Sequence, residues 1–481
     1  MASTPSHSSF DEKRQREAFK DQALQVDSAA ERWLVRKLDF RLLPCLVLAH
    51  LFTFIDRSSA GNAKVAGLST ELHLGNWGFN IGTCLYYVFY IAFEIPAVML
   101  VRRFGNRLVP LAVVAFGVVT IGTGFTHTKG DFYAVKCLLG MFEAFVLPGN
   151  SYIITQFYKR SELSVRIGFF ILSAGYLSGA FGGLLATGFL HIAPMGPVHT
   201  WRHIFVWEGV ITAGLGGILY FLYPTSLKTT SMLTEEERKL TSVRLGALPG
   251  EPISVANKFP SWIQLKEVLF NPLVLAPAFF YLINNITVTG TFIFTPTILA
   301  LNYPDASPFR IQLLSVPPNV CAWGFSVGLV YIAMRYNKHA VTALIGALFT
   351  VAGYGTWLAT DATFIQTRYT CLFLNTIGGC YGPIILAWTV SNAHSDTARA
   401  LTAAAVSGIG SIGSIVGSWS YFPTDAKTGY HIGNTLNVSL AVVVSVGIAA
   451  LWLLEFRANR RERTKDGTKD GNVDVGFRYV L

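Results

Sequence analysis

Residues 42–60 read LLPCLVLAHLFTFIDRSSA, an apolar run that carries no charge until Asp56 and Arg57. About 20 such residues in a helix cross the hydrocarbon core of a bilayer. Because no water is available there to bond the backbone, a spanning segment must be a helix or part of a closed barrel. The run is too long and unbroken for a barrel strand. It therefore predicts a transmembrane helix.

Runs of the same kind recur along the 481-residue chain, of which 52% is hydrophobic and only 14% charged. A soluble domain carries about 25% charged residues. We expect twelve membrane helices, at 42–60, 78–101, 107–126, 131–155, 164–190, 203–223, 272–300, 311–334, 340–360, 363–390, 398–420 and 433–456. This predicts an all-α membrane protein with two pseudo-symmetric six-helix bundles, the layout of many secondary transporters. The expected parts are a tail (1–41), a bundle (42–223), a central loop with a short amphipathic helix (224–271), a second bundle (272–456) and a tail (457–481).

The distribution of Lys and Arg sets the topology. With both termini in the cytoplasm, 30 of the 38 basic residues fall on the inner side and 7 on the outer side, which follows the positive-inside rule. The net charge of +10 is therefore a topology signal and does not indicate nucleic-acid binding. We expect a multi-pass membrane protein with both tails cytoplasmic, acting as a monomer.

Ionisable residues inside membrane helices are costly and are by default candidates for function. Lys136, Glu143 and Asn150 are spaced seven residues apart, so they share one helix face, which we expect to line a cavity. Arg57 and Lys136 lie at similar depth and would attract an anionic substrate. The alternative is that Arg57 pairs with an acid and Lys136 reaches the outer interface.

Glu143 lies at mid-membrane and is the first candidate for carrying a proton during transport, with a permanent structural ion pair as the alternative. Asp56 and Glu94 are further candidates, although Glu94, like Glu208, also fits a bracing role between helices. The second half offers only uncharged polar groups. Of these, we expect Asn284, Asn285 and Asn375 to complete the substrate site.

Glycine-rich runs at 173–188 and 407–418 occupy equivalent places in the two halves and predict close helix packing. They contain no phosphate-binding loop. No nucleophile or metal motif occurs elsewhere, and His191, His199 and His203 are read as chance neighbours. We therefore expect no enzyme activity, no cofactor and no metal. A non-transporting sensor is disfavoured by the short tails.

Several motifs resemble the anion:cation symporter branch of the major facilitator superfamily, the fungal allantoate-permease-like group, over about residues 40–456. They are DFRLLP (39–44), Asp56-Arg57 with the following glycines, YIAFEIP (90–96), LLGMFEAFVLPG (138–149), WRHIFVWEG (201–209), LTEEER (233–238) and PPNV (317–320). The resemblance implies proton-coupled uptake of small carboxylates or vitamins at the plasma membrane. It also implies that Arg57, Lys136 and Glu143 line the central cavity.

The sequence departs from that group at three places. Lys136 replaces an arginine, Phe145 replaces a glycine, and SNAHSDTAR (391–399) replaces a different pattern. Lysine lacks the planar fork that binds a carboxylate through two bonds. The expected function is thus proton-coupled symport of a small organic anion, and the alternative is export of a fungal secondary metabolite.

Overall fold

The computed structural model describes residues 28–227, 230–245, 266–267, 270–361, 363–393 and 396–466. Every regular element in these ranges is a helix, and an isolated bridge joins Met195 and Val198. Ten helices are long and apolar enough to cross a membrane, and two shorter apolar helices complete a set of twelve within the described residues. The expected all-α membrane fold is confirmed.

The first half contains the elements α2 to α9. They are α2 (Ser28–Val65), α3 (Leu68–Glu71), α4 (Gly78–Phe104), α5 (Leu108–Thr123), α6 (Lys129–Glu143), α7 (Val146–Phe157), α8 (Arg160–Leu190) and α9 (Trp201–Leu222). The helix expected at 42–60 is longer than its apolar run, because it is described from Ser28 and continues to Val65.

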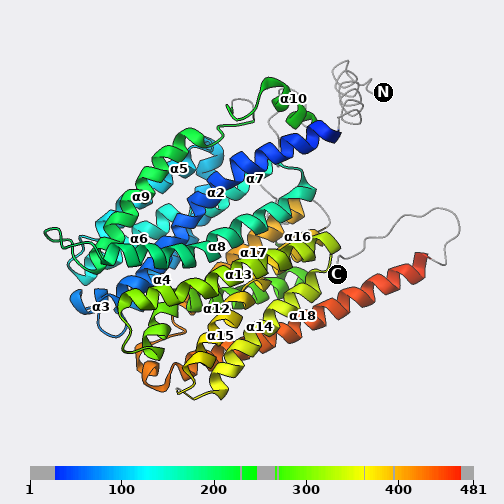
Figure 1. The fold of residues 1–481 in the computed structure, drawn as a ribbon. Helices are drawn as coiled ribbons and strands as arrows, with labels where there is room; N and C mark the ends of the chain where they lie inside the picture. Colours follow the sequence, from blue (N-terminus) through cyan, green and yellow to red (C-terminus); the bar gives the residue numbers. More distant parts are fainter. Residues whose placement is uncertain are drawn as a thin grey trace, which may run out of the picture.

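The second half repeats this order after the short helix α10 (Glu235–Arg244). It comprises α12 (Pro272–Asn302), α13 (Pro308–Tyr336), α14 (His339–Ala359), α15 (Ile365–Gly378), α16 (Tyr381–Ser391), α17 (Asp396–Gly417), the 3-10 helix η1 (Pro423–Thr428) and α18 (His431–Asp466). Both sets of helices run roughly parallel in one bundle (Figure 1). The two halves meet where α8 packs on α13, α2 on α12 and α4 on α17.

Two membrane helices are interrupted at equivalent places. The fourth breaks into α6 and α7 at residues 144–145, and the tenth into α15 and α16 at residues 379–380. At both breaks a backbone N–H donates to the carbonyl oxygen three residues earlier. Phe145 donates to Phe142 at 3.3 Å, and Cys380 donates to Ile377 at 3.2 Å. The sequence predicted continuous helices at 131–155 and 363–390. It missed these breaks although prolines mark them, because the rings of Pro148 and Pro383 meet the carbonyls four residues earlier, at Ala144 and Gly379.

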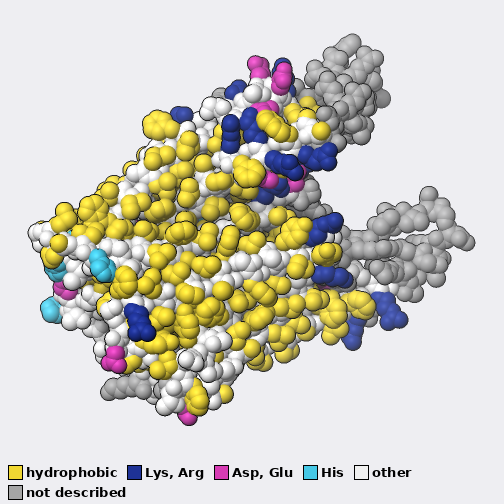
Figure 2. All heavy atoms as spheres, viewed as in Figure 1, with side chains coloured by type: hydrophobic (Ala, Val, Ile, Leu, Met, Phe, Trp, Pro, Cys, Tyr) yellow, Lys and Arg dark blue, Asp and Glu magenta, His cyan; other side chains and the backbone are white. Residues whose placement is uncertain are grey.

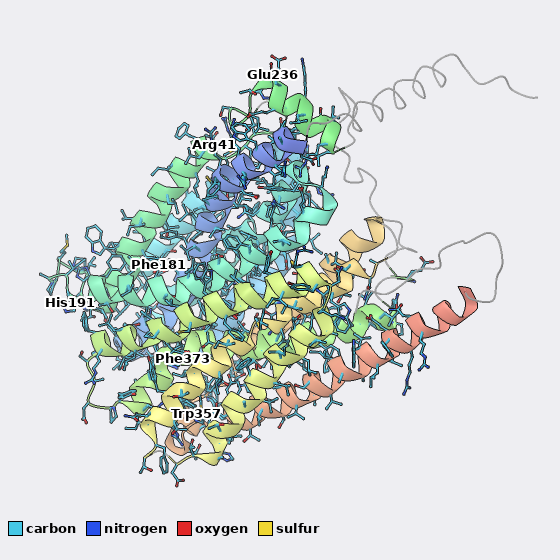
Figure 3. The ribbon with its side chains drawn as sticks, turned by 45° about the vertical axis from the view of Figure 1, so that its right-hand side comes forward. Arg41, Phe181, His191, Glu236, Trp357 and Phe373 are labelled. Carbon is cyan, nitrogen blue, oxygen red and sulfur yellow. The ribbon has the colours of Figure 1, made fainter. Side chains whose placement is uncertain are left out.

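Basic side chains gather at the end of the bundle that carries α10 and the start of α2, which we call the basic end (Figure 2). Arg41 and Glu236 lie there and His191 lies at the opposite end (Figure 3). The amphipathic helix expected in the central loop is α10, and Lys37 Nζ binds Glu237 at 2.7 Å. Burial opposes the charge of Glu237, but the bond and charge of Lys37 together with the hydrogen bonds from Thr234 outweigh it and lower the pKa of that carboxyl.

The same end holds a network of ion pairs that ties α10 to the first half. Glu31 accepts from Lys159 at 2.5 Å and from Arg244 at 2.8 Å, and Arg244 also pairs with Glu162. Arg244 has no exposed side-chain surface. Charged networks of this kind resist separation because a buried charge that loses its partner is costly. The central-loop helix is therefore fixed to the first half.

At the opposite end the two halves are in contact. Asn80 of α4 donates to the carbonyl oxygen of Ser418 at 2.6 Å, and the rings of Trp77 and Trp419 stack with centroids 5.7 Å apart. Gly61 of α2 faces α12 so closely that a β-carbon would overlap the carbonyl oxygen of Ile293. These contacts close the interface at that end.

We expect Gly61→Ala to open this contact. The added methyl group meets backbone, which cannot move aside as a flexible side chain would, so the cost falls on the closed conformation at roughly 1–3 kcal/mol. Hydrogen–deuterium exchange at the start of α4 should become faster. Gly122→Ala is the matched control, because nothing lies within 4 Å of its β-carbon position. Equal exchange in both variants would contradict the expectation.

Candidate functional site

A cavity of about 180 Å³ lies between the two halves. Its wall is formed by α2, α4, α7 and α8 of the first half and by α12, α13, α15, α16 and α17 of the second. Of the residues proposed from the sequence, the wall includes Arg57, Asn284, Asn285 and Asn375. It does not include Lys136, Glu143, Asp56 or Glu94.

Arg57 is the charged residue on the wall. Its Nε donates to Glu143 Oε2 at 3.2 Å, and its Nη2 is buried without a hydrogen-bond partner. Glu143 is 1% exposed and lies behind Arg57. The alternative expectation, that Arg57 pairs with an acid, therefore agrees with the ion pair that Arg57 forms with Glu143. The arrangement presents to the cavity a cation whose counter-ion is hidden in the first half.

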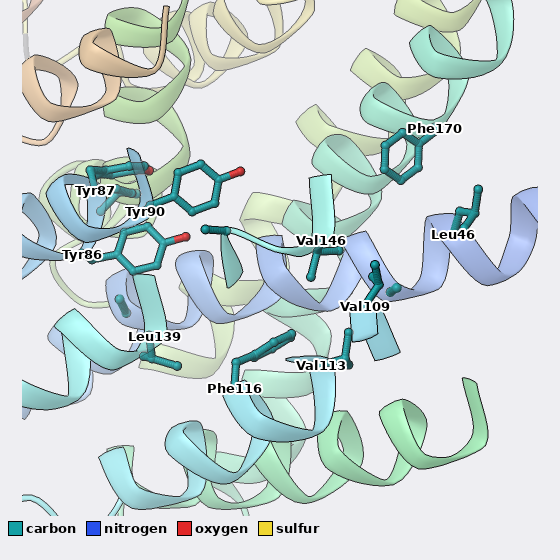
Figure 4. Packing of buried hydrophobic residues seen from close by; sticks show 14 of the residues in the cluster. Leu46, Tyr86, Tyr87, Tyr90, Val109, Val113, Phe116, Leu139, Val146 and Phe170 are labelled. Atoms are coloured by element: carbon teal, nitrogen blue, oxygen red, sulfur yellow. The ribbon is translucent and has the colours of Figure 1, made fainter. Parts of the chain in front are cut away.

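Aromatic rings surround the Arg57 guanidinium. Its carbon lies 4.9 Å from the ring centroids of Phe54 and Tyr90 and 5.4 Å from that of Tyr86. Tyr86, Tyr87 and Tyr90 project together from one helix (Figure 4). Tyr86 also donates its hydroxyl to Glu143 Oε2 at 2.5 Å. Cation–π contact in a poorly hydrated site stabilises the guanidinium and fixes its position.

This cage was missed in the sequence, although its signal was present. Tyr90 follows Tyr86 by four residues and Tyr87 by three, so it lies beside both on one side of α4. Gly140 allows α6 to approach them, because a β-carbon there would overlap the carbonyl oxygen of Tyr86. A tyrosine cluster opposite a small residue on a neighbouring helix therefore indicates a close helix contact around a charge.

Lys136 lies away from the cavity. Its Nζ is 3.9 Å from Asp56 Oδ2, and the rings of Phe132 and Phe205 lie beside it. Asp56 also accepts from Thr120 at 2.9 Å. Lys136 is only 3% exposed, so it does not extend to the outer interface.

The expectation that Lys136, Glu143 and Asn150 line the cavity is wrong for all three side chains. They do share a buried face, but it points into the first half. Asn150, for example, donates to the Leu46 carbonyl at 3.2 Å and accepts from Tyr223 at 2.9 Å. Other helices surround this helix on several sides. The seven-residue spacing of its polar residues therefore did not indicate whether they face the cavity or the interior of the first half.

The three asparagines of the second half differ in what they offer. Asn284 donates from Nδ2 to the carbonyl oxygen of Gly379 at 3.1 Å, so it satisfies the backbone at the helix break. The oxygen of Asn375 lies against Gly353 of α14, where a β-carbon would overlap it. Asn285 lies beside Gly410 of α17. Asn284 therefore uses its amide at the helix break, whereas the buried Oδ1 of Asn375 has no hydrogen-bond partner.

The glycine-rich helix α17 does more than pack. Its glycines face α12, where a β-carbon at Gly413 would overlap the carbonyl oxygen of Leu282. Its serines, at spacings of four and three residues, line the cavity instead: Ser407, Ser411 and Ser414. The sequence predicted the close packing of the glycines but not the position of these serines on the cavity wall.

Three further acids are placed by the structure. Glu94 is half-buried on α4, one helical turn beyond Tyr90. Glu208 is buried on α9, and its Oε1 has no hydrogen-bond partner. Glu455 of α18 is buried and accepts from Trp388 at 3.1 Å and from Asn392 at 3.0 Å. The expectation that the second half carries only uncharged polar groups is therefore wrong, because Glu455 lies near the end of an apolar run and was overlooked.

Comparison with known proteins identifies the family. The model of the Major Facilitator Superfamily matches residues 46–418. The chain belongs to the Major Facilitator Superfamily. A relative, the MFS-type transporter efuF of Hormonema carpetanum, is 30% identical over 92% of this chain and 88% of its own. The MFS transporter prlL of Fungal sp. (strain NRRL 50135) is 29% identical over 93% of this chain and 91% of its own.

Solved structures agree with this superfamily fold. A bacterial homolog of the human lysosomal transporter Spinster, in its inward-facing and unoccupied conformation, superposes with a TM-score of 0.63. The match covers 89% of this chain and 97% of that one at 15% sequence identity, which supports the fold alone. The protein is thus a multi-pass membrane transporter of this superfamily, and its substrate is a separate question.

Proposed function

We propose that this protein moves a small organic anion, a carboxylate or vitamin-like solute, by proton symport with alternating access. The observation that carries the proposal is the position of Arg57, which lines the cavity while Glu143 binds it from behind. A cation in a poorly hydrated cavity attracts an anion. The site is therefore suited to a solute that competes with Glu143 for the same guanidinium.

Competition of this kind couples the solute to a proton. While Glu143 is ionised it occupies Arg57, and the solute anion must displace it. When Glu143 takes up a proton, its hold on Arg57 weakens and the guanidinium becomes available to the solute. Binding of either the proton or the solute then favours binding of the other, which is a coupling free energy between two sites.

The surrounding charges support a role for one proton. Asp56, Glu143 and Glu208 are each 1% exposed; all three interact electrostatically with Lys136, and Glu143 also pairs with Arg57. These three acids and two cations are neutral together only when one carboxyl carries a proton. An uncompensated buried charge costs several kcal/mol, so a proton in this cluster is favoured.

The remaining residues take supporting roles in the proposal. Lys136 holds Asp56 in the cluster and supports the anion site from behind, and Glu94 passes the proton between the cluster and the basic end. Asn284, Asn285 and Asn375 complete the substrate site from the second half. We place both termini and the basic end in the cytoplasm, and the protein in the plasma membrane. We propose that it acts as a monomer, because one chain supplies the whole cavity wall.

Uptake by purified protein in proteoliposomes tests the proposal. A panel of labelled carboxylates is supplied with and without an imposed proton gradient. Accumulation of at least one acid should depend on the gradient. Uptake that ignores the gradient contradicts the coupling, and a panel that is not taken up at all contradicts the organic-anion substrate class.

Export of a secondary metabolite is the second candidate function. It is favoured by the aromatic and hydroxyl character of the wall and by the absence of Lys136 from it, because such a wall suits a bulky, weakly charged molecule. Expression in a sensitive host distinguishes the two directions. Export predicts resistance to an added toxic metabolite, whereas import predicts accumulation of the solute.

A further inference from the structure

His50 lies on the cavity wall and has no part in the function proposed above. It is on α2, seven residues before Arg57, which places the two side chains on the same face about 10 Å apart along the helix axis. His50 is 1% exposed. Its ring stacks on Phe170 with centroids 4.9 Å apart and meets the edge of Phe54 at 4.8 Å.

The hydrogen bonds of Thr53 determine which ring nitrogen of His50 carries the proton. Thr53 Oγ1 donates its hydrogen to the carbonyl oxygen of His50 at 2.8 Å. The same oxygen lies 3.2 Å from His50 Nδ1, and because its hydrogen is engaged with the nearer carbonyl, we assign Nδ1 as the donor. In the neutral ring, Nε2 is then a bare acceptor.

That acceptor is unsatisfied. Nε2 is buried and has no hydrogen-bond partner. By the covalent structure of histidine it is the ring nitrogen farther from the backbone of α2, and Nδ1 is the one that contacts Thr53. A buried acceptor left without a partner costs free energy, so a donor supplied by a ligand is favoured there.

We propose that His50 is a solute-binding residue, and that its Nε2 accepts a hydrogen bond from a hydroxyl, amide or ring N–H group of the solute. This inference rests on the proposed function and narrows its substrate class. Arg57 Nη2 is a buried donor without a partner on the same helix face. The two atoms together select an organic acid with a hydrogen-bond donor at the end remote from its carboxylate.

Matched pairs of labelled acids test this selection in proteoliposomes. The pairs are para-hydroxycinnamate with cinnamate, and omega-hydroxyhexanoate with hexanoate. The wild-type protein should have the lower KM for the hydroxylated member of each pair. His50→Phe keeps an aromatic ring between Phe54 and Phe170 but removes the acceptor, so it should raise the KM of the hydroxylated acids about 5- to 100-fold. The KM of the unsubstituted acids should rise by much less, so that the preference within each pair is lost.

Two further variants separate binding from packing. His50→Gln can still present an acceptor and should retain the preference for the hydroxylated acids. Thr53→Val lies off the cavity wall and releases Nδ1, so it should weaken the preference without affecting the unsubstituted acids. Equal KM values within each pair for the wild type, or an equal loss of both members in His50→Phe, would overturn the inference while leaving organic-anion transport standing. If other acids of the panel are taken up but neither pair is, the inference fails while organic-anion transport stands; if no acid is taken up, the proposed function fails and His50 loses this role with it.

Discussion

Glu143→Gln should abolish accumulation driven by a proton gradient while leaving exchange of the solute intact. The amide cannot ionise, so it no longer competes with the solute for Arg57, and solute binding becomes independent of pH. With one proton per solute, a gradient of one pH unit supports about tenfold accumulation by the wild type, and the variant should only equilibrate. Uptake into proteoliposomes with and without the gradient measures the difference.

Glu455→Gln is the matched control for this result. Glu455 is also a buried membrane carboxyl, but it lies in the second half and bonds Trp388 and Asn392 instead of a cation. Its substitution should leave the gradient dependence unchanged. Full gradient-driven accumulation by Glu143→Gln would remove Glu143 from the proton pathway and would make its pair with Arg57 a structural one.

Arg57→Ala should reduce solute affinity by about 2–5 kcal/mol, which is a loss of at least roughly thirtyfold, because the cation on the cavity wall is gone. The same change leaves Glu143 buried without its partner. Breaking a buried pair in this way costs roughly 3–5 kcal/mol of stability. Binding of a labelled acid and the thermal unfolding of the purified protein report the two effects separately.

The double variant Arg57→Ala with Glu143→Gln separates these effects further. It removes both charges, so most of the lost stability should return while transport stays absent. Arg57→Lys should be intermediate, since it keeps the charge without the planar fork. Wild-type affinity in Arg57→Ala would show that the solute binds elsewhere.

The sequence was informative where the bilayer alone determines the structure. Twelve apolar runs predicted the membrane helices. Arg57 was recognised as a candidate because a charged side chain inside a membrane helix is energetically costly. Asn284, Asn285 and Asn375 were proposed as substrate-site residues because they are polar groups inside membrane helices, and all three line the cavity.

Features that depend on contacts between distant helices were not predictable. Arg57 and Glu143 are 86 residues apart, and nothing local to either residue indicates that they meet. The spacing of Lys136 indicated a shared face but not the direction of that face. His50 was hidden within an apolar run, and its role depends on Thr53 and on the rings that enclose it.

The cluster of three acids and two cations also has an electrical consequence. For a monocarboxylate that crosses together with one proton, the loaded and empty carriers have the same net charge, so no charge crosses the membrane with the solute. A membrane potential contributes about 2.3 kcal/mol per elementary charge for each 100 mV, and here it would contribute nothing. The proposed carrier therefore follows acidity alone, and a depolarised cell would retain the full driving force for this solute.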